Sequence, residues 1–501
     1  MKRMSNINNI GKIIVFLILA YNLFIKFFIS LGLLPHSSHY LIDLFLGIGI
    51  LLGIIEIINR NKNRTINKQF WIIIVSLVIL ILFCILSALI GTSKFLLLIW
   101  HIRNNYRLFL YLILCYIFIN KKDITKIFNL SFYVLILHSI LATYQLFNYF
   151  YSYHHFYYQD YINGIFGTIK GYNTFSIVLI TGITSYFVFK YLFENKDTYK
   201  MVISLFLGGW VAAISELKII YIFIALLLVF IVIFSIKRIK LKKLIISIAI
   251  ISIATIFSFL SLQFFYPEFT NFFIDLDGLK NYVFDVSYGS VEREEININE
   301  NNNRNSSNTS NAETSKENAS EQIKQENLAG NEQTSNENNS ISNDDNVSTI
   351  PGFNRLSIFN IIPEYFFDSP IDYVFGIGAG NAEYSQNSIF CSDFYNLYIG
   401  TSYIRFSSSM FLLETGFLGL ILYVSQFIIL GIIFIQAIIK NWKDKVQNTY
   451  LFVFSLYFCV ITIIVIFYDA SLRSEASYFY GFLLSCGLIN LKNAKDVDHE
   501  E

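Results

Sequence analysis

Arg355 opens the stretch of this chain in which residue types and spacing come closest to a site for chemistry. Residues 353–424 pass from this single arginine through a short helical segment and a glycine-rich turn at 375–381 to Glu-Thr-Gly at 414–416, where a new apolar run begins. A helix N-terminus attracts anions, so an arginine there is mildly unfavourable unless a phosphate is bound by both the arginine and the helix N–H groups. The planar guanidinium also matches the geometry of a phosphate. We interpret Arg355 as a phosphate-binding residue, with contact to lipid headgroups as the alternative.

A second candidate cation, Lys218, lies in the sequence Ser-Glu-Leu-Lys at 215–218, between two apolar runs. A connection this short places both of its opposite charges at the edge of a membrane. One interpretation is an ion pair of Glu216 with Lys218, or a lysine that extends to the membrane surface. The other is a cation directed at an anionic ligand in an outward-facing cavity. The sequence leaves both open.

An aromatic segment at 151–173 is the third candidate. Its first half is rich in tyrosine, and its second half contains three glycines before an apolar run begins. Aromatic faces with polar tips suit stacking on sugars, and they equally suit the membrane interface. If the segment binds a substrate, we expect Lys170, Tyr172 and Asn173 to make the contacts.

Other charged residues adjoin the apolar runs. Arg103 and Arg107 are four residues apart and share a helical face, so they form either a second phosphate-binding pair or contacts to lipid headgroups. We interpret Asp469, Arg473 and Glu475 as an ion-pair cluster rather than a proton relay.

The composition places the chain in a membrane. It is 54% hydrophobic, 17% aromatic and only 15% charged, with a mean hydropathy of +0.52, whereas about a quarter of a soluble domain is charged. A net charge of +1, with the basic residues in short loops, gives no reason to expect a nucleic-acid partner. Lys2 and Arg3 precede the first apolar run, but no small-residue cleavage site follows, so we expect an uncleaved first helix.

Twelve apolar runs are long enough to be considered as membrane spans. They lie at about 11–34, 40–58, 70–91, 95–119, 126–150, 171–193, 199–215, 218–236, 243–265, 408–439, 448–468 and 475–491. Lysine and arginine cluster after every even-numbered run and are sparse after the odd-numbered ones, and such clusters mark cytoplasmic loops. We therefore predict an all-α polytopic integral membrane protein of about 12 transmembrane helices, with both termini cytoplasmic and one large extracytoplasmic loop.

The predicted organisation has four parts: helices 1–9 over 1–265, the large loop over 266–407, helices 10–12 over 408–491, and a cytoplasmic tail over 492–501. Within the loop, no aromatic residue occurs between Tyr288 and Phe353, and asparagine, serine and glutamate dominate. Such a segment buries too little apolar surface to offset its ordering entropy. We expect about 292–349 to be a disordered insertion without a role in chemistry.

The chain resembles the O-antigen polymerase and O-antigen ligase superfamily, the Wzy-type polysaccharide polymerases. The number of apolar runs and the large loop before the last three carry part of the resemblance. Three segments carry it locally: 355–381, with Arg-Leu-Ser-Ile and Gly-Ile-Gly-Ala-Gly-Asn; 414–420, with Glu-Thr-Gly-Phe-Leu-Gly-Leu; and 164–173.

The resemblance implies a GT-C-like glycosyltransferase in the bacterial cytoplasmic (inner) membrane. Such an enzyme would polymerise undecaprenyl-diphosphate-linked oligosaccharide repeat units into O-antigen, capsule or exopolysaccharide on the outer face. Both donor and acceptor are lipid-linked glycans, and no nucleotide sugar, cofactor or metal is implied. Membrane lipids, a flippase and a chain-length regulator are the implied partners.

The resemblance also implies roles for residues of this chain. Arg355 corresponds to the family's loop arginine, and Lys218 lies where members often carry a basic residue after a serine; with Glu414 they form the expected catalytic group. The residues expected to bind substrate are Arg405, Lys170, Arg103, Arg107, Tyr172, Asn173, Gly378 and Gly380.

Arg405 also marks a departure from the family pattern. Ligase-type members carry a histidine there, and this chain has no histidine between Phe353 and Asp498. A polymerase is therefore favoured over a ligase-type glycan transferase, and the general base is unassigned; Glu414 is a candidate but could simply anchor its helix. A lipid-linked oligosaccharide flippase or transporter is the other alternative, although the polar mid-membrane residues and internal repeats typical of transporters are not evident.

Overall fold

The computed structural model describes residues 2–62, 68–153, 161–169, 171–235, 239–266, 288–292, 349–385, 387–444 and 449–497. The chain divides into two compact units. One comprises Met1–Gly289 together with Gly352–Glu501, and the other is Ser290–Pro351. Most of the second unit, and with it the insertion expected to be disordered, lies outside the described residues.

Each of the twelve apolar runs contains a helix. The first nine are α1 (Lys2–Ser30), α2 (Leu41–Lys62), α3 (Lys68–Ile90), α4 (Phe95–Phe118), α5 (Lys121–Tyr153), α6 (Asn173–Glu194), α7 (Thr198–Ile214), α8 (Ile219–Ser235) and α9 (Leu241–Phe265). The last three are α16 (Ser407–Asp444), α17 (Thr449–Tyr468) and α18 (Ser477–Val497). The prediction of a mainly α-helical chain is therefore confirmed.

Eight helices in the described part of the chain are long and apolar enough to cross a bilayer, and α7 and α8 are shorter apolar helices. A multi-pass membrane protein is thus supported, while the number of twelve spans stays a prediction. Helix α3 shows why lipid is the natural surrounding. Its large exposed side chains recur at helical spacing, from Ile72 and Val75 to Leu82, Leu86 and Leu89, which is the pattern of a helix with one face on apolar surroundings.

Short elements connect α9 to α16. Strands β1 (Tyr288–Glu292) and β2 (Thr349–Phe353) form a two-stranded sheet. After β2 come the helices α13 (Ile358–Phe366), α14 (Pro370–Phe375) and α15 (Asp393–Tyr398), and the 3₁₀ turns η4 (Ser388–Phe390), η5 (Ile399–Thr401) and η6 (Tyr403–Arg405). The turns η1 (His36–Tyr40), η3 (Gly164–Phe166) and η7 (Ser471–Arg473) lie elsewhere in the helical unit.

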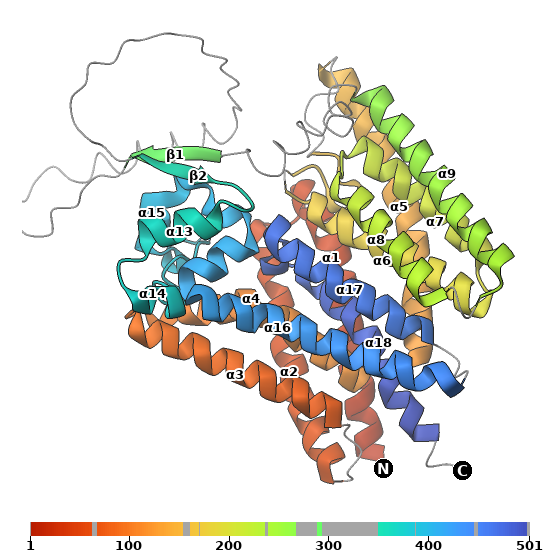
Figure 1. Ribbon diagram of the computed structural model, residues 1–501, viewed down its shortest axis with the longest axis horizontal. Coiled ribbons are helices and arrows are strands. Elements are labelled where there is room, and N and C mark those ends of the chain that lie inside the picture. Colours follow the sequence, from red (N-terminus) through yellow and green to blue (C-terminus); the bar gives the residue numbers. More distant parts are fainter. Residues whose placement is uncertain are drawn as a thin grey trace, which may run out of the picture. The chain divides into compact units, whose positions relative to one another are not determined.

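Helices far apart in sequence pack closely in the first unit. Helix α16 lies along α17 and α3, and α18 lies along α4. Gly481 permits the last of these contacts, because a Cβ on it would lie 2.6 Å from the carbonyl oxygen of Leu108. Helix α1 begins and α18 ends at the same end of this unit, and α13, α14 and α15 lie toward the opposite end (Figure 1).

Candidate functional site

A cavity of about 190 Å³ lies among segments that are widely separated in sequence. Its walls come from the start of α6, the turn between α7 and α8, the turn before α13, the turn η6 and the end of α17. The charged and amide side chains that line it are Asn173, Glu216, Lys218, Arg355, Arg405 and Asp469. Four of these, Asn173, Lys218, Arg355 and Arg405, were expected from the sequence to bind or transform a substrate.

Helix α6 presents its N-terminus to the cavity. Gly171, with φ +88°, turns the chain before the helix, and Asn173 and Thr174 in the first turn line the cavity. The backbone N–H groups of a first helical turn have no partner within the helix, and the helix dipole is positive there. This wall therefore favours an anion.

The turn between α7 and α8 supplies Lys218 and Glu216. Glu216 adopts a left-handed conformation, with φ +52°, and the backbone N–H of Leu217 donates to the carbonyl of Ala212 at 2.9 Å. The turn is so tight that both charges emerge at one place. Lys218 Nζ lies 2.6 Å from Glu216 Oε1. The sequence left two interpretations of Lys218 open, an ion pair with Glu216 and a position in a cavity. In the structure Lys218 has both.

Arg355 is held on a turn just before α13. Asn354 Oδ1 accepts hydrogen bonds from the backbone N–H groups of Leu356 and Ser357, at 3.1 and 2.6 Å, and Ser357 Oγ accepts one from the N–H of Asn354 at 2.9 Å. The Arg355 guanidinium lies 4.6 Å from the centre of the Tyr468 ring, a cation–π contact. Two local restraints thus direct this half-buried arginine into the cavity.

Arg405 ends η6, a turn that is anchored to the rest of the loop. The hydroxyl of Tyr403 in the same turn donates to the carbonyl of Ala382 at 2.8 Å, and Ser402, with φ +60°, starts the turn. Phe406 follows and also lines the cavity.

Among the described residues, three cations and two carboxylates line the cavity. Because Glu216 is the ion-pair partner of Lys218, the other charges of the lining are Arg355, Arg405 and Asp469, and the two guanidinium groups outweigh the one carboxylate. Two guanidinium groups with a helix N-terminus form a set of donors suited to phosphate oxygens. The arrangement can bind a phosphate or diphosphate and can stabilise negative charge that develops on it.

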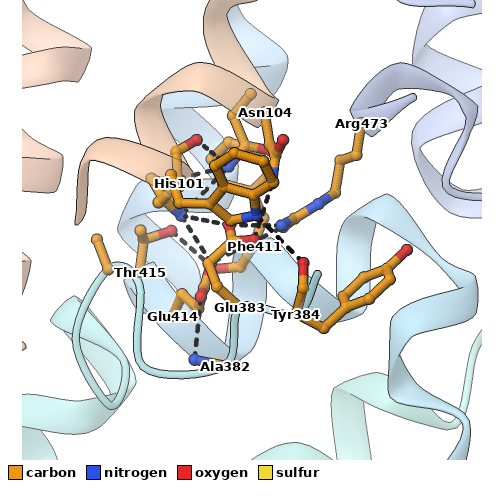
Figure 2. A network of polar contacts seen from close by, with 12 residues as sticks. His101, Asn104, Ala382, Glu383, Tyr384, Phe411, Glu414, Thr415 and Arg473 are labelled. Carbon is orange, nitrogen blue, oxygen red and sulfur yellow. Dashed lines mark hydrogen bonds and ion pairs between the residues drawn. The ribbon is translucent and has the colours of Figure 1, made fainter. Parts of the chain in front are cut away.

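Glu414 lies in a separate, fully buried network (Figure 2). Its Oε2 lies 2.6 Å from Nδ1 of His101, and its Oε1 accepts a hydrogen bond from the backbone N–H of Ala382 at 3.0 Å. Arg473 is paired with Glu383 at 2.5 Å and lies 3.8 Å from Glu414. Of the two roles considered for Glu414, these contacts support the anchoring one.

Glu383 shows how Arg473 stabilises this network. Burial by itself raises the pKa of the Glu383 carboxyl, but the charge of Arg473 and hydrogen bonds from His101 and Asn104 outweigh it, so the pKa is lowered. Ligand atoms of His101, Glu383 and Glu414 lie within 4.8 Å of one another, as in a metal site. Arg473 already supplies a cation to these two carboxylates, so the donor set does not call for a metal ion.

The glycine-rich turn and the Glu-Thr-Gly segment pack against each other. A Cβ on Gly416, which has φ +64°, would lie 2.6 Å from the backbone of Val374, and the N–H of Ile377 donates to the carbonyl of Leu413 at 2.8 Å. Ser87 of α3 joins both segments, because its hydroxyl contacts the carbonyl oxygens of Phe375 at 2.7 Å and Glu414 at 2.9 Å. These two motifs form a structural joint.

Gly378 and Gly380, two of the residues expected to bind substrate, belong to this joint. A Cβ on Gly378 would lie 2.8 Å from the Cα of Gly91, and one on Gly380 would lie 2.7 Å from the backbone of Leu97. Close approach to the connection between α3 and α4, at Gly91, and to the first turn of α4, at Leu97, therefore gives a packing reason for both glycines. Neither glycine is among the residues that line the cavity.

Arg103, Arg107 and Tyr172 lie in a third cluster instead of the cavity. Arg103 Nη2 lies 2.7 Å from Asp43, and Arg107 Nη1 lies 3.6 Å from Glu475. Lys26 of α1 connects Glu475 with Tyr172, because its Nζ lies 3.1 Å from the Glu475 carboxylate and 4.8 Å from the centre of the Tyr172 ring. Carboxylates of the chain itself face both arginines. Lys170 lies outside the described residues.

The sequence suggested one ion-pair cluster of Asp469, Arg473 and Glu475. In the structure these residues lie in three separate groups: the cavity, the buried network around Glu414, and the cluster around Lys26. Asp469 lines the cavity, Arg473 belongs to the network in Figure 2, and Glu475 pairs with Lys26. Sequence reasoning missed the cavity role of Asp469 and Tyr468. Their position at the end of α17, on the same predicted side as Lys218, was the available signal.

Comparison with protein-family models and with curated proteins gives no match for this chain. Membership of the O-antigen polymerase and ligase superfamily therefore stays a prediction.

Proposed function

We propose that this protein is a glycosyltransferase that polymerises glycans linked to a lipid diphosphate, as the Wzy-type polymerases do. The observation that carries the proposal is the cavity in which Lys218, Arg355, Arg405 and the start of α6 meet. These residues come from four segments, and sequence reasoning had proposed them as cations for a diphosphate or as substrate contacts. A shared cavity is what such a role requires.

The proposed chemistry follows from charge. An acceptor hydroxyl attacks the anomeric carbon of the donor sugar, the bond from that carbon to the diphosphate oxygen breaks, and the electron pair leaves with the lipid diphosphate. Negative charge grows on the departing group in the transition state. Preorganised cations at that position lower the barrier more than they stabilise the bound substrate. Arg355 and Arg405 supply bidentate donors, and Lys218 supplies a point charge.

The position of the cavity favours a transferase over a transporter. Its walls are helix ends and connecting turns: the start of α6, the α7–α8 turn and the end of α17. Transporter sites generally lie near the middle of the bilayer, between interrupted helices. Under the orientation given by the basic loops, these helix ends face the outside of the cytoplasmic membrane, where finished lipid-linked units would be available.

Arg355→Ala tests the proposal directly. Loss of one donor to the developing charge should slow chain extension by about 10²–10³-fold, so long chains should disappear from the cell surface while single units are still exported. Arg355→Lys should retain partial activity, because it keeps the charge but not the fork. The measurement is the chain-length distribution of surface polysaccharide, with the amount of protein in the membrane determined in parallel.

Lys94→Ala is the matched control, because Lys94 pairs with Asp393 on the surface and both side chains are largely exposed. It should leave chain length unchanged. A normal chain-length distribution in Arg355→Ala cells would remove Arg355 from the mechanism. Single units trapped inside cells that lack the protein would indicate a flippase instead.

A further inference from the structure

The proposed reaction needs a group that takes the proton of the acceptor hydroxyl, and the sequence left that group unassigned. Glu414 is fully buried, and its carboxylate contacts the His101 ring and accepts a hydrogen bond from the backbone N–H of Ala382. It is not among the residues that line the cavity. In the part of the chain that the structure describes, the carboxylates that line it are Glu216 and Asp469, and we compare these two.

Glu216 already has a partner for its charge. Its Oε1 lies 2.6 Å from the ammonium of Lys218, in a turn whose backbone holds both residues. A proton acceptor in this position would give up that ion pair as it became protonated, and Lys218 would lose the neighbour that orients it. Glu216 is therefore better suited to hold the lysine in place.

Asp469 is fixed in position from three sides. Its Oδ1 accepts a hydrogen bond from the backbone N–H of Ser471 at 2.8 Å. Its carbonyl accepts two from Ser407 at the start of α16, from the N–H and from Oγ, both at 3.0 Å, and its own N–H donates to Val465 at 3.1 Å. A carboxylate on a backbone held this firmly can be aimed at one point in the cavity.

The surroundings of Asp469 also make it a stronger base than an ordinary aspartate. Burial raises the pKa of its carboxyl, and the hydrogen bonds from Ser471 and the charge of Arg355 offset only part of that rise. A carboxylate whose pKa is closer to neutrality is a better proton acceptor at physiological pH. The charged groups that share the cavity with it are Lys218 and Glu216 from the α7–α8 turn, Arg355 and Arg405, and Tyr480 of α18 lies close enough to interact with it electrostatically.

We propose that Asp469 is the general base that accepts the proton of the acceptor hydroxyl, an inference that rests on the proposed function. As the acceptor oxygen forms its bond to the anomeric carbon, its proton passes to the Asp469 carboxylate. The bond from the anomeric carbon to the diphosphate breaks, and the electron pair leaves on a diphosphate held by the neighbouring guanidinium groups. The protonated Asp469 then returns its proton to water, and the carboxylate is restored.

Asp469→Asn is the decisive variant, because the amide oxygen can still accept the hydrogen bond from Ser471. Chain extension should fall by about 10²–10⁴-fold, the usual contribution of a general base. Binding of inorganic diphosphate should be retained, and should tighten by about three- to tenfold because a negative charge has left the cavity. Loss of activity with tighter anion binding is a combination that a purely structural role would not produce.

The rate is measured in right-side-out membrane vesicles of the source cells, which contain their own lipid-linked glycans, so that the bath sets the pH at the proposed outer face. The wild-type rate should fall on the acid side as Asp469 becomes protonated. Asp469→Glu should keep part of the activity and shift this acid limb. Asp393→Asn, an exposed aspartate on the surface, is the matched control and should change neither rate nor binding.

Three results would overturn the inference. One is a wild-type rate in Asp469→Asn. Another is a parallel loss of rate and of diphosphate binding in that variant, which would make Asp469 a structural residue. The third is a fall of the rate at acid pH that is lost in Glu216→Gln and kept in the Asp469 variants, which would assign the base to Glu216. By contrast, failure of the wild-type protein to bind diphosphate would overturn the proposed function itself, and unchanged binding in Arg355→Ala would remove Arg355 from the diphosphate site.

Discussion

At the scale of single residues, the surroundings of two arginines differ. The difference distinguishes an arginine proposed to bind a ligand from one that stabilises the fold. Arg355 is half-buried, lies against Tyr468 and faces a cavity. Arg473 is buried and faces two carboxylates of its own chain, Glu383 and Glu414. The first arginine lines a cavity together with Asp469, whereas the second belongs to a buried ion-pair network.

Arg473→Met should therefore destabilise the protein. It leaves two carboxylates buried without their cation, and breaking a buried pair in this way costs about 3–5 kcal/mol. The measurement is the Tm of the purified protein in detergent, with Lys94→Met, at an exposed pair, as a control that should not change it. An unaltered Tm in Arg473→Met would show that the network does not stabilise the fold.

The stability that the Arg473–Glu383 ion pair contributes should depend on pH in a defined direction. Arg473 lowers the pKa of Glu383 in the folded protein, so the stability it contributes is fully present above the ordinary pKa of a glutamate. That contribution is lost as the pH falls through the lowered pKa. Without Arg473 the pKa of Glu383 is higher, because burial raises it, so the variant takes up this proton at a higher pH than the wild type. The difference in Tm between wild type and Arg473→Met should accordingly be largest at neutral pH and shrink as the pH falls toward the lowered pKa of the wild type.

At the scale of elements, the kink in α16 is the place where this helix packs against the segment that follows β2. Gly416 leaves the helical conformation, with φ +64° and ψ −171°, and the chain at Val374 packs into the space this creates. The kink sets the direction of the first part of α16, before Gly416, relative to the rest of the helix. Glu414 lies in this first part, and Arg405 lies in the turn η6 just before it. The geometry of the kink thus positions both the cavity wall and the buried network.

Gly416→Ala tests this joint. A Cβ would lie 2.6 Å from the backbone of Val374 in a conformation that L-residues rarely adopt, so the joint must shift and stability should drop by about 1–3 kcal/mol. Gly431→Ala is the control in the same helix, because its Cβ would meet nothing closer than Leu456 at 3.5 Å. It should be neutral or slightly stabilising, since alanine favours a helix. Equal melting temperatures for the two variants would contradict the assigned role of the kink.

At the scale of the whole molecule, the orientation in the membrane that the basic loops predict can be measured. A cysteine introduced at position 307, in the long loop, should react with a membrane-impermeant maleimide in intact cells. One introduced at position 65, between α2 and α3, should react only after permeabilisation. Cys84, Cys115, Cys459 and Cys486 are buried, so only Cys391 needs replacement by serine beforehand. The reverse labelling pattern would place the cavity on the cytoplasmic side and remove access to an external acceptor.

The sequence predicted the helices well, and part of its candidate site residues lie together in the structure. Apolar periodicity and length are local properties, so each of the twelve runs contains a helix. Lys218, Arg355, Arg405 and Asn173 were recognised by residue type and position, and they share a cavity. Glu414, Gly378 and Gly380 were recognised from motifs, and the structure places the two glycines in a packed joint and Glu414 in a buried network, outside the residues that line the cavity.

By itself, the sequence determined that the chain is built of apolar helices suited to a membrane, because burial in lipid requires long apolar runs whatever their partners are. Only the tertiary structure decided which charges meet. Arg355 faces a cavity, Arg473 faces carboxylates and Asp469 lies beside Arg355, although the sequence suggested that Asp469 and Arg473 belong to one ion-pair cluster. Whether a charge binds a ligand or another residue depends on neighbours contributed by distant segments, and no local pattern contains that information.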